Sequence, residues 1–181
     1  IKKRQRQNKT KTKTKNTKKF IDIPYSNKNF EGIIDYFSKH SNIEEEIKIT
    51  SSSIDEGDLQ KVLQTNYPNN EFHTKNEPNS WICIEFIQHQ IKPTNCTIRS
   101  NNWSNGRASH PQNWIIEGSN DLARWEKLSE EKNNLTLKGP NIVHTFPIQN
   151  QTDQAFKYIR IFQNGPSCGC NNYLCLNCIE I

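Results

Sequence analysis

Seven short runs rich in β-branched and aromatic residues, several with apolar residues at every second position, follow one another from residue 72 to the end of the sequence. They cover residues 81–86, 94–100, 113–118, 125–128, 142–148, 156–163 and 173–181. Alternation with a period of two is typical of strands with one buried face, and the Asn, Gly, Pro and Asp residues between the runs mark turns. Because almost no helical pattern separates the runs, the strands are expected to pair antiparallel. The sequence therefore predicts an all-β fold that closes as a β-sandwich or jelly roll.

The large apolar residues of these runs form the predicted core. Its members are Ile82, Ile84, Phe86, Ile98, Trp114, Ile116, Phe146, Tyr158, Phe162, Leu174 and Leu176. Upstream, the spacing of apolar residues in Phe30–His40 predicts one short amphipathic helix. Ile43, Ile47 and Ile49 begin a period-two pattern, and Asp58–Leu63 is expected to add one helical turn.

The charge of the chain is divided between a basic tail and an acidic body. Residues 1–19 hold ten of the 24 Lys and Arg residues and no acidic residue, so the rest has 14 basic against 19 acidic side chains. We expect residues 1–19 to be a disordered basic linker and residues 20–181 to be the folded domain. A nuclear-localisation or nucleic-acid arm is the alternative for the tail. The acidic body argues against nucleic-acid binding by the folded domain.

The ends and the hydropathy of the chain add two expectations. Met is absent and the chain opens with Ile1, so we expect the sequence to be a fragment that begins after the true start. No run approaches the roughly 18–20 apolar residues that span a bilayer, so no membrane insertion is expected.

Six cysteines leave three interpretations open. Cys168, Cys170, Cys175 and Cys178 have a spacing that resembles a zinc site, but Cys175 and Cys178 lie three apart in a strand-like run and would point to opposite faces. Three disulfides are a second interpretation. We favour buried, reduced side chains at most positions, with only Cys168 and Cys170 exposed in a Gly-containing loop.

The sequence lacks the motifs that usually accompany catalysis. It contains no GxSxG, HExxH, P-loop or GxGxxG pattern, and its five histidines lack metal-ligand spacing. We therefore expect a non-enzymatic protein without a cofactor or a bound metal.

Antiparallel pairing places alternate loops at the same end of the sandwich. Loops near 73–80, 101–112, 130–141 and 164–172 are expected to share the end away from the C-terminus, and loops near 87–93, 119–124 and 150–155 the other. Loops on a rigid scaffold commonly hold binding residues. The predicted ligand-binding residues at the first end are Trp103, Arg107, His110, His73, Asn79 and Asn172. In the alternative interpretation, Trp103 only caps the core and Arg107 only pairs with an acidic neighbour.

The strand sequences resemble a known family. The most specific piece is Trp114-x-x-Glu117-Gly118-Ser119-Asn120-Asp121 followed by Trp125, together with the strand Lys157-Tyr158-Ile159-Arg160 and the terminal Ile179-Glu180. In order and spacing, residues 30–181 resemble the discoidin domain, also called the coagulation factor five/eight type C domain. The helix around Gly32 and Tyr36 further resembles intracellular protist members, often found behind a BTB domain.

The resemblance implies a galactose-binding-like jelly-roll β-sandwich with ligand loops opposite the termini. It also implies binding of a sugar, a phospholipid headgroup or a protein without catalysis. We expect a protein or peptide partner, with the domain as the target-reading arm of a larger adaptor in the cytoplasm. The alternative is a carbohydrate-binding, lectin-like domain.

Overall fold

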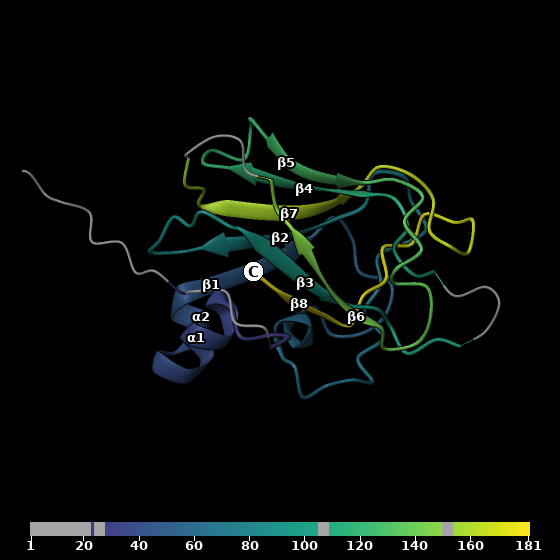
Figure 1. The fold of residues 1–181 in the computed structure, drawn as a ribbon, viewed down its shortest axis with the longest axis horizontal. Coiled ribbons are helices and arrows are strands. Elements are labelled where there is room, and N and C mark those ends of the chain that lie inside the picture. The colour runs from purple at the N-terminus through teal and green to yellow at the C-terminus, as the bar shows by residue number, and fades with distance from the viewer. Residues whose placement is uncertain (1–22, 24–27, 105–108, 150–153) are drawn as a thin grey trace, which may run out of the picture.

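A computed structural model describes residues 23, 28–104, 109–149 and 154–181, and the predicted basic linker over 1–19 lies outside this part of the chain. The described strands form a five-stranded sheet in the order β1-β2-β7-β4-β5 and a three-stranded sheet in the order β6-β3-β8, all paired antiparallel (Figure 1). The strands are β1 (Ile47–Ser51), β2 (Trp81–Phe86), β3 (Asn95–Arg99), β4 (Trp114–Ser119), β5 (Glu126–Glu131), β6 (Val143–Pro147), β7 (Tyr158–Gln163) and β8 (Cys178–Glu180). The predicted all-β sandwich is confirmed.

The N-terminal elements differ in detail from the predicted ones. The helix α1 (Ile33–His40) starts three residues later than the pattern suggested, because Phe30 has a φ of 63° and cannot continue a right-handed helix. Ile43 begins a single helical turn, α2 (Ile43–Glu46), and not a strand, since the Asn42 side chain accepts the Glu44 N–H at its start. The expected turn near 58–63 is present as the 3₁₀ helix η1 (Leu59–Leu63).

The core lies between the two sheets, and the predicted register of β7 was wrong by one residue. Tyr158 and Phe162 were expected inside, but they lie half-buried on the outer face of the five-stranded sheet. Ile159 and Ile161 take the inner positions, with 1% and 3% of their surfaces exposed. Both registers of this strand present apolar residues to the core, so alternation alone could not choose between them. The other nine predicted core residues are buried.

The last predicted strand is shorter than expected. Within 173–181, only Cys178–Glu180 pairs as β8, while Cys175 forms an isolated bridge to His73. Ahead of β8 the chain bonds instead to the connection between β1 and β2: the Leu176 N–H donates to the Phe72 carbonyl, and the Asn177 side chain donates to the carbonyls of Pro68 and Asn70. Side-chain hydrogen bonds of this kind compete with a regular ladder.

Most of the cysteines are buried, as predicted. Cys83, Cys96, Cys175 and Cys178 are buried free thiols, Cys168 is half-buried and Cys170 is exposed. Burial raises the pKa of the Cys83, Cys175 and Cys178 thiols to about 12 and that of Cys96 further still. Within the described residues, no group of three or more His, Cys, Asp and Glu side chains is arranged to hold a metal ion.

The residues behind the family resemblance have structural partners. The Arg160 guanidinium donates to Glu117 Oε2 at 2.6 Å and lies 3.8 Å from the Trp125 ring centroid. Gly118 faces the Phe156 ring, and a Cβ there would come within 2.5 Å of it. This motif therefore joins β4, β7 and the start of β5, and its members stabilise the fold.

A buried carboxylate attaches α1 to the C-terminal strand. Glu180 accepts the N–H groups of Ile34, Asp35 and Ile181 at 2.7, 2.9 and 3.0 Å, which caps the N-terminus of α1. Burial raises the pKa of Glu180 to about 7, although these three hydrogen bonds act to lower it. The helix and the end of the chain therefore stabilise each other.

Candidate functional site

The predicted division of loops between two ends of the sandwich is confirmed. The loops after β1, β3, β5 and β7 gather at the right of Figure 1, away from the C-terminus. Hydrogen bonds link them: the Asn113 side chain donates to the Pro166 carbonyl and accepts the Asn133 N–H, while the Cys168 N–H donates to the His110 carbonyl. We call this end the loop end. It is the candidate functional site.

Three aromatic side chains from separate loops meet at the loop end. The His73 ring lies between the rings of Trp103 and Tyr173, each with a centroid 5.2 Å away and near-perpendicular to it. His73 is 5% exposed, whereas Trp103 and Tyr173 are half-buried and reach the surface. Edge-to-face aromatic packing of this kind is favourable and directional. We call Trp103, His73 and Tyr173 the aromatic cluster.

Backbone pairing and two carboxylates hold His73 in place. Its N–H donates to the Glu56 carbonyl and its carbonyl accepts the Asp55 N–H, both at 3.0 Å. Nδ1 lies 3.7 Å from Asp55 Oδ2, and Nε2 lies 3.6 Å from Glu56 Oε2. Carboxylates on both sides of the ring make the local potential negative, so this part of the loop end suits a ligand that is neutral or positively charged.

Several buried polar atoms near the loop end have no hydrogen-bond partner among the described residues. They include Asn102 Oδ1, His110 Nδ1, Trp114 Nε1 and Gln163 Oε1. Trp114 and Gln163 face each other in the register of β4 and β7, at the ends of these strands that point to the loops. Burial lowers the pKa of His110, opposed by a hydrogen bond to the Trp103 backbone. Unpaired buried polar groups destabilise a protein unless a water or a ligand pairs them.

The predicted site residues are only partly brought together. Trp103 and His73 are in contact, and His110 bonds to the backbone of Trp103 but is itself buried. The Asn172 N–H donates to Asn76 Oδ1, and Asn79 is exposed in the turn before β2 with a φ of 65°. Arg107 lies outside the described residues. A ligand contact for any of these residues stays a prediction.

Tyr173, Asp55 and Glu56 were not among the site residues predicted from the sequence. Tyr173 was assigned to the last strand, so it was expected in the sheet and not in a loop. The two carboxylates come from the connection after β1, and an isolated bridge between Glu56 and His73 brings them to the ring. The one signal in the sequence was a short polar stretch ahead of His73, which does not specify a pairing between positions 17 residues apart.

The family of the chain follows from a match over most of its length. The model of the Sad1/UNC-like C-terminal family matches residues 52–181. The chain belongs to this family. The predicted discoidin resemblance is confirmed, because this domain has the discoidin or galactose-binding-like fold. The link to protist members and to a BTB domain stays a prediction.

Two relatives are very long proteins with a segment similar to this one. The E3 ubiquitin-protein ligase Ufd4 of Drosophila melanogaster is 32% identical over 141 residues, which are 75% of this chain and 5% of that protein. The E3 ubiquitin-protein ligase hecd-1 of Caenorhabditis elegans is 30% identical over 110 residues, which are 60% of this chain and 4% of that protein. The chain therefore spans about one twentieth of the length of these relatives.

Solved structures with the same fold are carbohydrate-binding modules. CpGH89CBM32-5 from Clostridium perfringens, solved with GalNAc-β-1,3-galactose, has a TM-score of 0.56 at 14% identity, covering 74% of this chain and 92% of that one. The lectin domain of lectinolysin, complexed with Lewis b antigen, has a TM-score of 0.55 at 14% identity, covering 74% and 89%. Identities this low establish the fold alone. No helix in the described residues is long and apolar enough to cross a membrane.

Proposed function

We propose that this domain is a non-enzymatic recognition module that binds a protein or peptide partner through the loop end. The observation that carries the proposal is the aromatic cluster, in which a buried histidine orients Trp103 and Tyr173 at the surface. Trp and Tyr are the residues most enriched among binding hot spots. The partially exposed rings are held by packing, so little side-chain freedom is lost on binding.

Sequence relatives favour a protein partner. The two ligases resemble this chain at 30–32% identity, whereas the sugar-binding structures share 13–19%. A ubiquitin ligase must select its target proteins, and a recognition module within a long chain suits that task. We therefore propose that the domain selects the target for a larger protein inside the cell, where its four buried thiols would stay reduced.

Carbohydrate binding is the second candidate. It is supported by solved structures of the same fold, one of which is a family 32 module bound to galactose. Aromatic rings that reach the surface can also stack on the apolar face of a sugar ring. The unpaired Asn102 Oδ1 and His110 Nδ1 would suit the hydroxyl groups of such a ligand.

One paired experiment separates the two candidates. The full chain, tagged and immobilised, is used to capture proteins from a cell lysate and is applied in parallel to a glycan array. A protein ligand captured by the wild type and lost on Trp103→Ala and Tyr173→Ala supports the first proposal. Binding to defined glycans that the same variants abolish replaces it with the second. Leu122→Ala is the matched control, since Leu122 is 53% exposed at the opposite end.

If both variants keep full binding to the captured protein or glycan, the loop end is not the binding surface. The loops at 87–93 and 119–124 would then be the next surface to test.

A further inference from the structure

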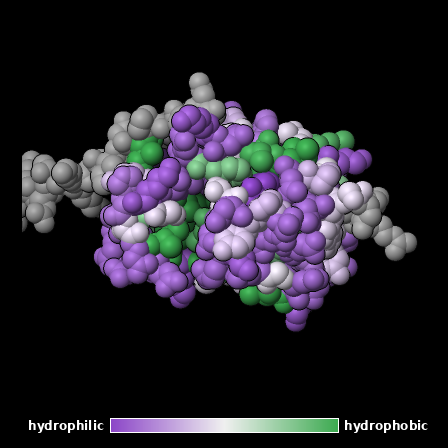
Figure 2. All heavy atoms as spheres, turned by 90° about the horizontal axis from the view of Figure 1, so that it is seen from below, coloured by the Kyte–Doolittle hydropathy of each residue, from purple (hydrophilic) through white to green (hydrophobic). Residues whose placement is uncertain are grey.

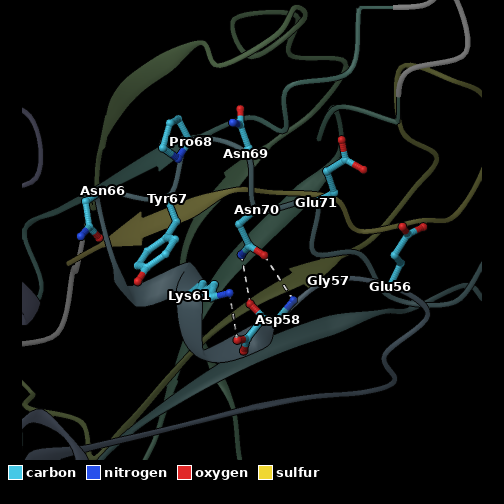
Figure 3. Close-up of a pocket in the computed structure, with 10 residues that line it drawn as sticks. All are labelled: Glu56, Gly57, Asp58, Lys61, Asn66, Tyr67, Pro68, Asn69, Asn70 and Glu71. Atoms are coloured by element: carbon cyan, nitrogen blue, oxygen red, sulfur yellow. Dashed lines mark hydrogen bonds and ion pairs between the residues drawn. The ribbon is translucent and has the colours of Figure 1, made fainter.

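A second concave feature lies outside the loop end, in the long connection between β1 and β2. Ten residues of one continuous stretch surround a cavity of about 520 Å³ (Figure 3). They are Glu56, Gly57, Asp58, Lys61, Asn66, Tyr67, Pro68, Asn69, Asn70 and Glu71. Cavities of this size hold a small ligand or several side chains of a peptide. We call this feature the η1 cavity because η1 forms one of its walls.

The lining of the η1 cavity is acidic, with one aromatic wall. Three carboxylates face one lysine, so the lining has a net charge of −2. The Glu71 carboxylate is half-buried and has no hydrogen bond or ion pair among the described residues. Tyr67 is 40% exposed. Hydrophilic side chains cover most of the surface on the side of α1 and η1, with smaller hydrophobic patches between them, as Figure 2 shows.

The cavity already accommodates one ammonium group. Lys61 Nζ lies 3.7 Å from Asp58 Oδ2 and 5.1 Å from the Tyr67 ring centroid (Figure 3). A carboxylate and an aromatic face around one ammonium group form the geometry that attracts cations. Asp58 is in turn positioned by the Asn70 side chain, which accepts the Asp58 N–H and donates to its carbonyl. Lys61 thus shows how an ammonium group can bind in this cavity, and Glu56 and Glu71 are the carboxylates of the lining that could bind a second one.

Phe30, near the start of the described domain, lies close to this cavity. The Arg99 guanidinium lies 5.5 Å from the Phe30 ring centroid and donates to the Thr65 carbonyl at 2.9 Å. Asn177 accepts from Arg99 and donates to the carbonyls of Pro68 and Asn70, so both side chains support the wall formed by residues 65–70. Phe30 therefore lies one side chain away from that wall. The ten residues between Lys19 and Phe30 can span up to about 35 Å, which suffices for a lysine to reach the cavity.

The basic segment has a spacing that suits such a cavity. Single threonines separate Lys9, Lys11, Lys13 and Lys15. Residues 1–19 contain no acidic side chain that could pair with these lysines in place of the cavity. In an extended chain, residues two apart project to the same side about 7 Å apart. The segment contains ten basic residues, whereas residues 20–181 contain five more acidic than basic residues. The attraction is strong at low salt and is increased by the tether between them.

We propose that the η1 cavity binds lysine side chains of the chain's own N-terminal segment, residues 2–19, with Glu71 as the main contact. This inference does not depend on the ligand of the loop end. The two surfaces share Glu56, whose carboxylate lies near His73 and also lines the cavity. The N-terminal segment would therefore lie next to a partner bound at the loop end.

Zero-length carbodiimide cross-linking of the full 181-residue chain tests the proposal. Chymotrypsin cuts after Phe20, Leu63 and Phe72, so the peptide 1–20 keeps its lysines and the peptide 64–72 has Glu71 as its one carboxylate. We expect the 1–20 and 64–72 peptides to be joined, with a yield roughly fivefold or more above that for Glu77, an exposed residue in the peptide 73–81. Salt at about 0.5 M should remove this preference.

Controls distinguish binding in cis from other outcomes. Mixing ¹⁵N-labelled and unlabelled chains identifies links between copies, and links found only between copies overturn the proposal. Glu71→Gln should remove the salt-sensitive links to the cavity, whereas Glu130→Gln, on β5, should leave them unchanged. Near-UV circular dichroism verifies that each variant is folded. If Glu77 and Glu71 react equally, or if no link from residues 2–19 forms, the segment does not occupy the cavity.

Discussion

The two ends of the sandwich differ in how completely their polar groups are paired. At the end that holds the C-terminus, the Asn120 side chain bonds to Gln90, Ala155 and Lys157, and Asp121 accepts the N–H groups of Ala123 and Arg124. At the loop end, Asn102 Oδ1 and His110 Nδ1 are buried without a partner among the described residues. We call the end that holds the C-terminus the committed end, because these polar groups are already paired within the fold. The unpaired buried atoms of the loop end can still pair with a ligand or a water.

The residues that reveal the family belong mostly to the committed end. Asp121 organises the turn after β4, and Arg160 joins Glu117 to the Trp125 ring. They identify the fold without identifying the ligand. Four predictions test this division, in order of their expected effect on stability.

Trp114 tests where the loop end stops and the core begins. Its side chain is fully buried and packs edge-on against Phe146 at 5.1 Å, so Trp114→Ala should destabilise the domain by about 3–5 kcal/mol. That is a large share of the stability of a small domain, and most of the variant should be insoluble. Urea unfolding of the soluble fraction measures the loss. A soluble variant with wild-type stability would place Trp114 outside the core.

Glu180 should make the committed end sensitive to pH. Its pKa is about 7 in the folded domain against an ordinary 4.5, so the folded state holds this proton more tightly than the unfolded state. The stabilisation is complete below pH 4.5 and is lost as the pH rises through 7. The loss should reach about 3 kcal/mol.

The measurement compares the wild type with Glu180→Gln by urea unfolding between pH 4.5 and 8. Because other carboxylates titrate in both proteins, the difference between the two curves isolates Glu180. Glu77→Gln, at an exposed position, is the control. A difference that stays constant with pH would mean that folding does not raise the pKa of Glu180.

Arg160→Lys tests the motif on the outer face of the five-stranded sheet. Lysine keeps the charge near Glu117 but loses the planar group that stacks on Trp125, 3.8 Å away, and on Phe162, 4.9 Å away. We expect a loss of about 1 kcal/mol, seen as a lower urea midpoint. The exposed Lys127→Arg on β5 should change nothing. An unchanged urea midpoint for Arg160→Lys would mean that the charge pair with Glu117, and not the stacking on Trp125, accounts for the stabilisation.

The aromatic cluster should show the smallest effect on stability. Each ring contact with His73 is a single edge-to-face pair at 5.2 Å between partly exposed side chains, so Trp103→Ala and Tyr173→Ala should each cost only about 0.5 kcal/mol. Binding to a captured partner should weaken by roughly thirtyfold, which corresponds to about 2 kcal/mol. Thermal unfolding and binding are measured on the same samples. Loss of the fold in both variants would make Trp103 a capping residue of the core.

Particular residues show why the prediction from sequence was partial. Ile47 and Ile49 alternate with Lys48 and Thr50, so the buried face of their strand could be read directly. The strand from Tyr158 to Gln163 offers apolar residues on both faces, and its register depended on pairing with β2 and β4. The grouping of alternate loops at one end could be predicted, because the chain reverses direction between consecutive antiparallel strands. Tyr173 was missed because an aromatic residue before a strand resembles the strand itself.

The sequence by itself determined the fold class, the sharing of one end by alternate loops and the burial of most cysteines, because these follow from local periodicity and chain direction. Tertiary structure alone decided which side chains meet. It set His73 between Trp103 and Tyr173, placed Glu180 under α1 and brought Arg99 against both Phe30 and residue 65. Such contacts join positions up to 146 residues apart. Their partners are selected by the packing of the two sheets, which no local pattern encodes.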